Sequence, residues 1–178
     1  MKRFLKKTGI WIGAILLALI LFSFLLPREV SVSRSITVDA PIDRVFEQVN
    51  DLRNWEKWSP WKRMDPMMEM TFSNPPIGEG AFYKWVSQDK HLGSGTMTLA
   101  KVVNNEEIVT ALHNDNWGDA NSTFLFGHKG KGVEVTWKMT MDVGVMPWSK
   151  YFGIAMKSEM KKQFDKGLAG IKFYAEKS

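Results

Sequence analysis

Apolar and polar residues alternate with two different periods along this chain, and the periods predict its elements. Residues 30–38 (VSVSRSITV) alternate with a period of two and are rich in β-branched side chains, which predicts a half-buried strand. Residues 42–49 place apolar side chains three and four apart, which predicts a short helix beginning after Pro41. A second short helix is expected from its N-cap, Asp51, to Pro60, which should end it.

Six more segments with the period of a strand follow these two helices. They are expected at residues 67–72, 81–87, 95–103, 108–113, 122–126 and 132–143, separated by turns rich in glycine, proline and asparagine. The last is apolar on one face along its whole length, and so long a strand predicts a strongly curved antiparallel sheet. A long amphipathic helix should then run from Pro147 to about Ala175. Strands in one run with helices at the ends of the domain predict an α+β fold.

The N-terminus has a different pattern. Residues 9–26 (GIWIGAILLALILFSFLL) are uncharged and apolar, and as a helix they would span about 27 Å, close to the hydrocarbon thickness of a bilayer. Basic residues precede the run, so the positive-inside rule predicts a cytoplasmic N-terminus (residues 1–8), a transmembrane helix (residues 9–26) and an extracytoplasmic domain (residues 27–178). The expected location is the cell membrane, with a single pass and a domain that is periplasmic if the cell is Gram-negative.

A cleaved signal peptide is the alternative to this anchor. The apolar region of a signal peptide is usually about 7–15 residues long and is followed by a small-x-small site. The nearest such site here, Ser31-Val32-Ser33, lies well past Pro27. An uncleaved anchor is therefore the favoured interpretation.

The positive charge is concentrated at this end of the chain. The sequence has 24 basic and 19 acidic residues, and Lys2, Arg3, Lys6 and Lys7 supply four of the basic ones. The remaining 20 basic residues balance the acidic ones to about +1, which gives no electrostatic footprint for nucleic acid. The absence of cysteine excludes disulfides, zinc–thiolate sites and thiol nucleophiles.

Residues suited to acid–base or metal chemistry do not form a recognisable set. The three histidines, His91, His113 and His128, have no ligand spacing, so no metal, cofactor or catalytic constellation is predicted. Asp115 and Asp119 flank Asn116-Trp117-Gly118, expected to be a loop or, alternatively, a rim that contacts a ligand. Glu69 is expected to face solvent.

Three tryptophans, Trp55, Trp58 and Trp61, recur at intervals of three in NWEKWSPWKRMDP. Each buries about 150–250 Å² when packed, so each should enter a core, line a cavity or lie at a membrane. The first two share a face of the second short helix and are expected in the core. Trp61 follows Pro60, is expected in extended chain, and is the candidate to meet a ligand or the bilayer.

Several segments together resemble a known family. The stretch VSRSITVDAPIDRVFEQVNDLRNWEKWSPW (residues 32–61), with GTMTL (95–99), VEVTW (133–137) and FDKGLA (164–169), is similar to START-related, Bet v 1-like (SRPBCC) proteins of the polyketide cyclase/dehydrase type. The resemblance implies a helix-grip fold, in which a seven-stranded antiparallel sheet wraps a long C-terminal helix, two short helices follow the first strand, and a hydrophobic cavity lies between sheet and helix. Family members bind lipids, sterols, polyketides and other apolar ligands, and a minority are enzymes.

The aromatic and methionine side chains on the inward faces are the candidate cavity lining, since methionine suits an adaptable apolar pocket. The candidates are Trp58, Trp61, Met68, Met70, Phe72, Tyr83, Trp85, Met97, Leu99, Phe124, Phe126, Trp137, Met139, Met156 and Met160. The favoured function is a membrane-anchored binding protein for a lipid or other hydrophobic small molecule. The alternatives are a cyclase- or hydrolase-type enzyme acting on an apolar ligand, and an envelope protein-interaction module with a collapsed cavity.

Overall fold

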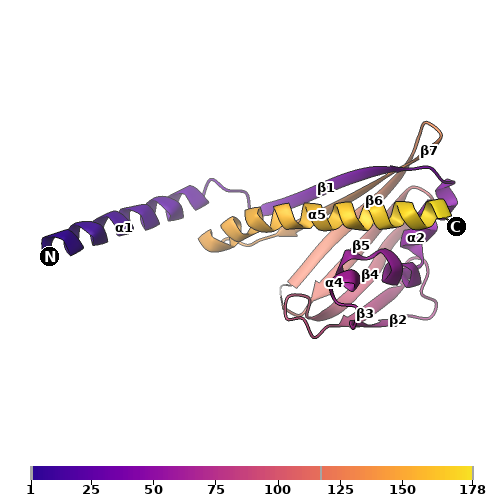
Figure 1. Ribbon diagram of the computed structural model, residues 1–178, viewed down its shortest axis with the longest axis horizontal. Helices are drawn as coiled ribbons and strands as arrows, with labels where there is room; N and C mark the ends of the chain where they lie inside the picture. The colour runs from indigo at the N-terminus through magenta and orange to yellow at the C-terminus, as the bar shows by residue number, and fades with distance from the viewer. Residues whose placement is uncertain (1, 117, 178) are drawn as a thin grey trace.

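One antiparallel sheet of seven strands forms the body of the protein (Figure 1). The computed structural model describes residues 2–116 and 118–177, with side chains from residue 7 onward. The strand order is β1-β7-β6-β5-β4-β3-β2, so that the first and last strands of the chain pair with each other. The strands are β1 (Glu29–Val38), β2 (Glu69–Phe72), β3 (Phe82–Val86), β4 (Ser94–Val103), β5 (Glu107–Asn114), β6 (Gly118–Lys129) and β7 (Gly132–Asp142).

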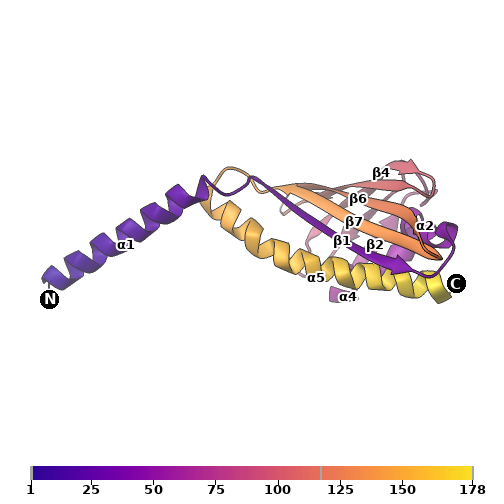
Figure 2. The ribbon, with the colours of Figure 1, turned by 90° about the horizontal axis from the view of Figure 1, so that it is seen from above.

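The long C-terminal helix α5 (Pro147–Lys177) lies along one face of this sheet (Figures 1 and 2). Its buried side chains, among them Phe164, Leu168 and Ile171, recur three or four residues apart and pack into the core. The predicted α+β, helix-grip arrangement is therefore confirmed. The remaining helices are α1 (Lys2–Ser23), α2 (Ile42–Asn50), the 3₁₀ turn η1 (Leu52–Asn54), α3 (Trp55–Trp58) and α4 (Pro60–Met64).

The segment after α3 differs from its prediction. Pro60 does not end the helical region; it occupies the first turn of α4 and follows the extended residue Ser59 (φ −58°, ψ 126°). Proline suits the first helical turn because its missing N–H would have no partner there. Trp61 consequently lies on a helix, and the prediction of extended chain was wrong.

The hairpin between β5 and β6 is also tighter than expected. Asn114 ends β5 and pairs with Gly118, the first residue of β6. Asp115 and Asn116 form a turn, Gly118 and Asp119 already belong to β6, and Trp117 lies outside the described residues. Polar side chains occupy most positions near this turn, so the sequence shows no alternation of apolar and polar residues there.

The N-terminal helix ends earlier than the apolar run of the sequence. Residues 24–26 continue it only as a turn, with backbone bonds such as Leu26 N to Ser23 O at 3.2 Å. Lys150 Nζ donates to the carbonyls of Ser23 and Leu26, both at 3.0 Å, and so ties this turn to the start of α5. In the part of the chain that the structure describes, none of the helices combines the length and hydropathy needed to cross a membrane.

Trp55 and Trp58 are completely buried, as predicted. Their indole N–H groups donate to the carbonyls of Val49 (2.9 Å) and Gln48 (2.7 Å), and their rings lie 4.5 Å apart. These bonds satisfy the indole N–H groups and the last carbonyls of α2 at the same time. The tryptophans thereby fix α3 against α2.

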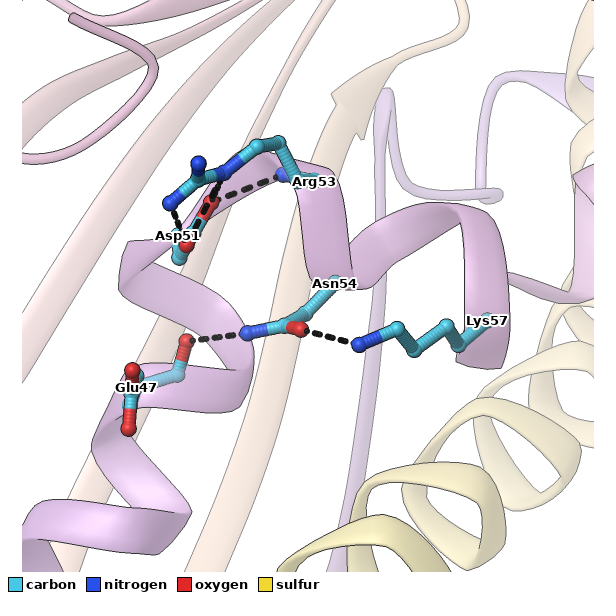
Figure 3. Close-up of polar contacts among 5 residues, drawn as sticks. All are labelled: Glu47, Asp51, Arg53, Asn54 and Lys57. Carbon is cyan, nitrogen blue, oxygen red and sulfur yellow. Dashed lines mark hydrogen bonds and ion pairs between the residues drawn. The ribbon is translucent and has the colours of Figure 1, made fainter.

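Polar side chains hold the same turn from outside (Figure 3). Asp51 caps η1 by accepting from the backbone N–H of Arg53 at 3.0 Å, and it also pairs with the Arg53 guanidinium. Asn54 donates to the Glu47 carbonyl at 3.2 Å and accepts from Lys57 at 3.0 Å. The cap predicted at Asp51 is confirmed, and it positions the helices that cover one end of the sheet.

Candidate ligand-binding cavity

A cavity of about 640 Å³ lies between the sheet and the first half of α5. Helix α4, strands β2 to β7 and the loops next to them, including residues 90–92 between β3 and β4, contribute the rest of its wall. Ligand sites in proteins are typically about 300–1,000 Å³, so the volume suffices for a lipid-sized or polyketide-sized molecule.

The strand register explains the sheet side of the wall. Tyr83 on β3 pairs with Met97 on β4, Met97 pairs with Leu112 on β5, and Leu112 pairs with Ala120 on β6. Side chains directly opposite one another across a sheet point to the same face, so these four residues form one row, and all four line the cavity. Ala120 is the smallest of them and leaves space in front of the row.

Trp85 packs against the sheet beside this row, where it pairs with Gly95. Its indole lies over Gly95, where an added Cβ would be 2.4 Å from Trp85 Cη2 and 2.2 Å from the His113 carbonyl oxygen. Only glycine permits this approach. The indole N–H donates to the Leu92 carbonyl at 3.2 Å, which leaves the ring as an apolar surface of the cavity.

Ten of the fifteen residues predicted as cavity lining do line it. They are Trp61, Met68, Met70, Tyr83, Trp85, Met97, Trp137, Met139, Met156 and Met160. Four come from β2, β3 and β4, two from β7, two from α5, and Trp61 and Met68 from α4 and the segment after it. The structure brings these ten together around one cavity, and their contact with a ligand stays a prediction.

The other five predicted residues, Trp58, Phe72, Leu99, Phe124 and Phe126, lie outside the cavity wall. Trp58, Leu99 and Phe124 are fully buried in the core. Phe126 packs edge-on against Phe46 of α2, with ring centroids 5.2 Å apart, and Phe72 packs on Tyr83 at 6.0 Å. Placing these five in the cavity was wrong, because α2, α3 and the second half of α5 fill that part of the sheet's inner face.

Trp61 occupies a half-buried position on α4 and faces the cavity. Its ring lies edge-on to that of Trp137, with centroids 5.7 Å apart. Of the three tryptophans in the sequence motif, it alone lines the cavity. Trp58, which was expected in the core and was also a cavity candidate, lies in the core with Trp55. Trp61 lines the cavity from a helix and not from extended chain.

Polar groups in the wall were missed by the sequence interpretation. Asn114 and Ser122 are buried and satisfied: Asn114 donates to the Leu92 carbonyl at 2.9 Å, and the Ser122 hydroxyl bonds to that of Thr110 at 2.7 Å. Gln163 on α5 donates its amide N–H to Glu159 at 2.6 Å. No pattern in the sequence marks these residues, since polar residues on a helix or strand usually face water.

Two titratable side chains of the wall, Tyr83 and Glu159, have shifted pKa values. Burial raises the pKa of Tyr83, so its hydroxyl stays protonated. Hydrogen bonds from Gln163 and Lys162 lower the pKa of Glu159, so this carboxyl is ionised. Within the described residues, no three histidine, aspartate or glutamate side chains gather as metal ligands.

Solved structures with a similar fold share little sequence with this chain. A protein of unknown function from Staphylococcus aureus superimposes with a TM-score of 0.62 at 15% identity, covering 82% of this chain and 94% of that one. An uncharacterised protein from Rhizobium leguminosarum gives 0.61 at 12% identity, with 84% and 96% covered. The di-domain aromatase/cyclase StfQ of the steffimycin biosynthetic pathway gives 0.64 at 10% identity, with 84% and 51% covered. At these identities the likeness establishes the fold alone.

The sequence itself gives the family. No curated protein matches the chain. The profile of one family, described as "Polyketide cyclase / dehydrase and lipid transport", matches residues 29–176. These residues include every strand, the short helices and nearly all of α5, so the match covers the whole body that encloses the cavity. The chain therefore belongs to the polyketide cyclase/dehydrase and lipid transport family.

Proposed function

We propose that this protein binds a lipid or other hydrophobic small molecule in the cavity between the sheet and α5. The observation that carries the proposal is the cavity itself, about 640 Å³ in volume, in whose wall most of the apolar side chains are methionine or aromatic. A volume of this size favours binding over a protein-interaction role with a collapsed cavity. The family description and the aromatase/cyclase named above are consistent with an apolar ligand.

The first turns of α5 supply an opening for such a ligand. Phe152 lines the cavity and is nevertheless 66% exposed, so the cavity reaches the surface beside it. Val145, Met146 and Trp148, in the turn before α5 and at its start, are also exposed. An exposed apolar rim of this kind marks a surface that contacts a ligand, a membrane or another protein.

We further propose that the N-terminal segment anchors the protein in the cell membrane, with residues 1–8 in the cytoplasm and residues 27–178 outside it. The uncharged run at residues 9–26, with basic residues before it, supports this part of the proposal. The helical part of the run, residues 9–23, is about 22 Å long, so a crossing also requires residues 24–26. The rim around Phe152 is close to the end of α1, since Lys150 donates to the carbonyl of Ser23, the last residue of α1, and to that of Leu26 in the turn after it.

Native mass spectrometry of the full chain, released from lipid nanodiscs, tests the binding function. We expect an additional mass of lipid size on the protein. Ala120→Phe fills the cavity and should abolish this mass, whereas Ala111→Phe, on the opposite face of the sheet, should leave it unchanged. Loss of the mass in both variants, or in neither, would contradict a ligand held in the cavity.

Alkaline carbonate extraction and a C-terminal alkaline phosphatase fusion test the anchor. We expect the chain to stay with the membrane pellet and the fusion to be active, because phosphatase folds only outside the cytoplasm. Recovery of an intact chain in the supernatant would rule out the anchor. A mature N-terminus near Ser33 would instead establish the cleaved signal peptide.

A further inference from the structure

The methionines of this chain gather around the cavity. The sequence has 11 of them, and eight of those in the described part of the chain line the cavity wall. Met67 and Met146 are 82% and 52% exposed and lie outside the wall, and Met1 lies outside the described residues. The eight are Met64, Met68, Met70, Met97, Met139, Met141, Met156 and Met160.

These eight side chains come from both sides of the cavity. Helix α4, the segment between α4 and β2, the strands β2, β4 and β7, and helix α5 each contribute at least one. Met156 and Met160 are four residues apart on α5 and therefore share one face of that helix. A ligand in the cavity would meet methionine on the helix side and on the sheet side.

The packed core has a different composition. Among the described residues, the largest fully buried side chains are tryptophan, phenylalanine, leucine, isoleucine and valine, and none is methionine. Branched and aromatic side chains adopt few conformations, whereas methionine is unbranched and turns about three bonds. The chain thus places its stiff side chains in the core and its flexible ones around the cavity.

The aromatic part of the wall is fixed by contacts outside the cavity. Trp137 stacks on Phe164 and on Phe124, with ring centroids 4.0 Å and 4.7 Å apart. Trp85 donates its indole N–H to the Leu92 carbonyl at 3.2 Å. These rings cannot turn without losing those contacts. A methionine thioether is only a weak hydrogen-bond acceptor, so the methionines are the part of the wall that can change shape around a ligand.

We infer that the cavity accepts apolar ligands of different shapes, chains and rings alike, because its methionine side chains rearrange around each of them. Flexible, methionine-rich surfaces repack against unlike partners in proteins of broad specificity. A close-packed wall of branched side chains would fit one shape better than the others. The inference rests on the proposed binding function and adds the class of ligand: a range of apolar molecules that share a volume and not a shape.

Three neutral probes with twelve carbons each differ in shape: dodecanol, dodecanol with a cis double bond at its middle, and cyclododecanol. Binding of each radiolabelled probe to the full chain in lipid nanodiscs is measured against empty nanodiscs, which corrects for partition into the lipid. The test variant combines Met139→Leu, Met156→Leu and Met160→Leu, which keeps volume and apolarity but introduces branched side chains at the wall. The control combines Met67→Leu and Met146→Leu, the same change outside the cavity.

We expect the wild type and the control to bind the three probes with affinities within about 3-fold of one another. The triple variant should keep its affinity for one probe and bind at least one of the others about 10-fold more weakly, because leucine cannot extend or fold back as methionine does.

Methionine methyl NMR is a second measurement, and it does not depend on whether the triple variant folds. In the wild type with isotope-labelled methionine methyl groups, the signals of the cavity methionines should move to different positions with each probe. The signals of Met67 and Met146 should stay where they are in the free protein. Identical positions for all three probes would mean that the wall does not adapt, and would overturn the inference.

The two proposals fail in different ways. If none of the probes binds, the cavity-binding function is wrong. If the wild type binds one probe more than about 10-fold better than the other two, the cavity selects one shape and the inference is overturned. The same holds if the triple variant accepts all three probes as the wild type does, since the methionines are then not what makes the cavity adaptable.

Discussion

The indole of Trp137 on β7 lies parallel to the phenyl ring of Phe164 on α5, with centroids 4.0 Å apart and planes inclined by only 5°. Phe124 stacks on the same indole at 4.7 Å. These rings join the sheet to the helix at the point where the packed core ends and the cavity begins. The packing of α5 at this point therefore affects both the stability of the fold and the shape of the cavity.

Gly170→Ala should destabilise the protein, although alanine favours helix formation by about 1 kcal/mol. A Cβ at this position would lie 2.8 Å from Trp58 Cβ and 3.1 Å from the Trp58 carbonyl oxygen, so backbone would have to move. We expect a net loss of about 1–3 kcal/mol in urea unfolding. Gly127→Ala is the control, because an added Cβ there meets nothing within 4 Å. An unchanged midpoint for Gly170→Ala would mean that α5 is not held this close to α3.

Trp58→Phe should cost about 2–4 kcal/mol, whereas Trp61→Phe should cost less than about 1 kcal/mol. The first change leaves the Gln48 carbonyl without the indole N–H that lies 2.7 Å away, in a fully buried site. The second alters a half-buried residue at the cavity wall. Urea midpoints check the stabilities, and the fluorescence response to added lipid should be altered by Trp61→Phe. Equal costs for the two variants would remove the distinction between a core and a cavity tryptophan.

Asp51→Asn should lower stability at neutral pH and have progressively less effect in acid. Burial acts to raise the pKa of Asp51, but hydrogen bonds from the Arg53 side chain and backbone outweigh it and lower the pKa below its usual value. Because the pKa of Asp51 is lowered in the folded state, its stabilising contribution is fully present above the pKa of the unfolded state, about 3.9. The contribution is lost as the pH falls through the pKa of the folded state. Urea midpoints of wild type and variant should therefore differ at pH 7 and converge towards pH 3. A constant difference over this range would show that the carboxylate charge is not what stabilises the turn.

His113 should titrate above the usual histidine value of about 6.5. Its Nδ1 lies 2.5 Å from Asp119 Oδ1, and that hydrogen bond, followed by the charge of Asp119 and the weaker charge of Asp115, raises the pKa. The raised pKa implies a stabilising contribution that is complete below the unfolded-state value and disappears as the pH rises through the folded-state value. NMR titration of the ring protons checks this.

The matched variants for His113 are Asp119→Asn and Asp115→Asn. The first should return the midpoint most of the way to the usual value, and the second should shift it less, because Asp115 lies 3.6 Å from the ring. A larger shift with Asp115→Asn would mean that Asp115, and not Asp119, is the carboxylate nearer to the His113 ring.

Strand and helix periods were readable along the chain because each element buries one face. The alternation at residues 30–38 and 132–143 predicted β1 and β7 to within one residue, and the spacing after Pro147 predicted α5. Where neither face carries a period, as in the hairpin at Asn114 and Gly118, the ends of the two predicted strands were missed. Trp61 was placed in extended chain because a proline at the first turn of a helix has the same local sequence as one that ends a helix.

The inward direction of a side chain is a local property, and the sequence by itself determined it. Ten inward residues proved to line a cavity and five to fill a core, and that difference depends on which helix lies over each stretch of the sheet. Only the tertiary structure decided it, since α2, α3 and the second half of α5 cover one part of the sheet and leave the part beneath the first half of α5 unfilled. The same holds for Gln163, whose position on a mostly polar helix gave no sign that it lines the cavity.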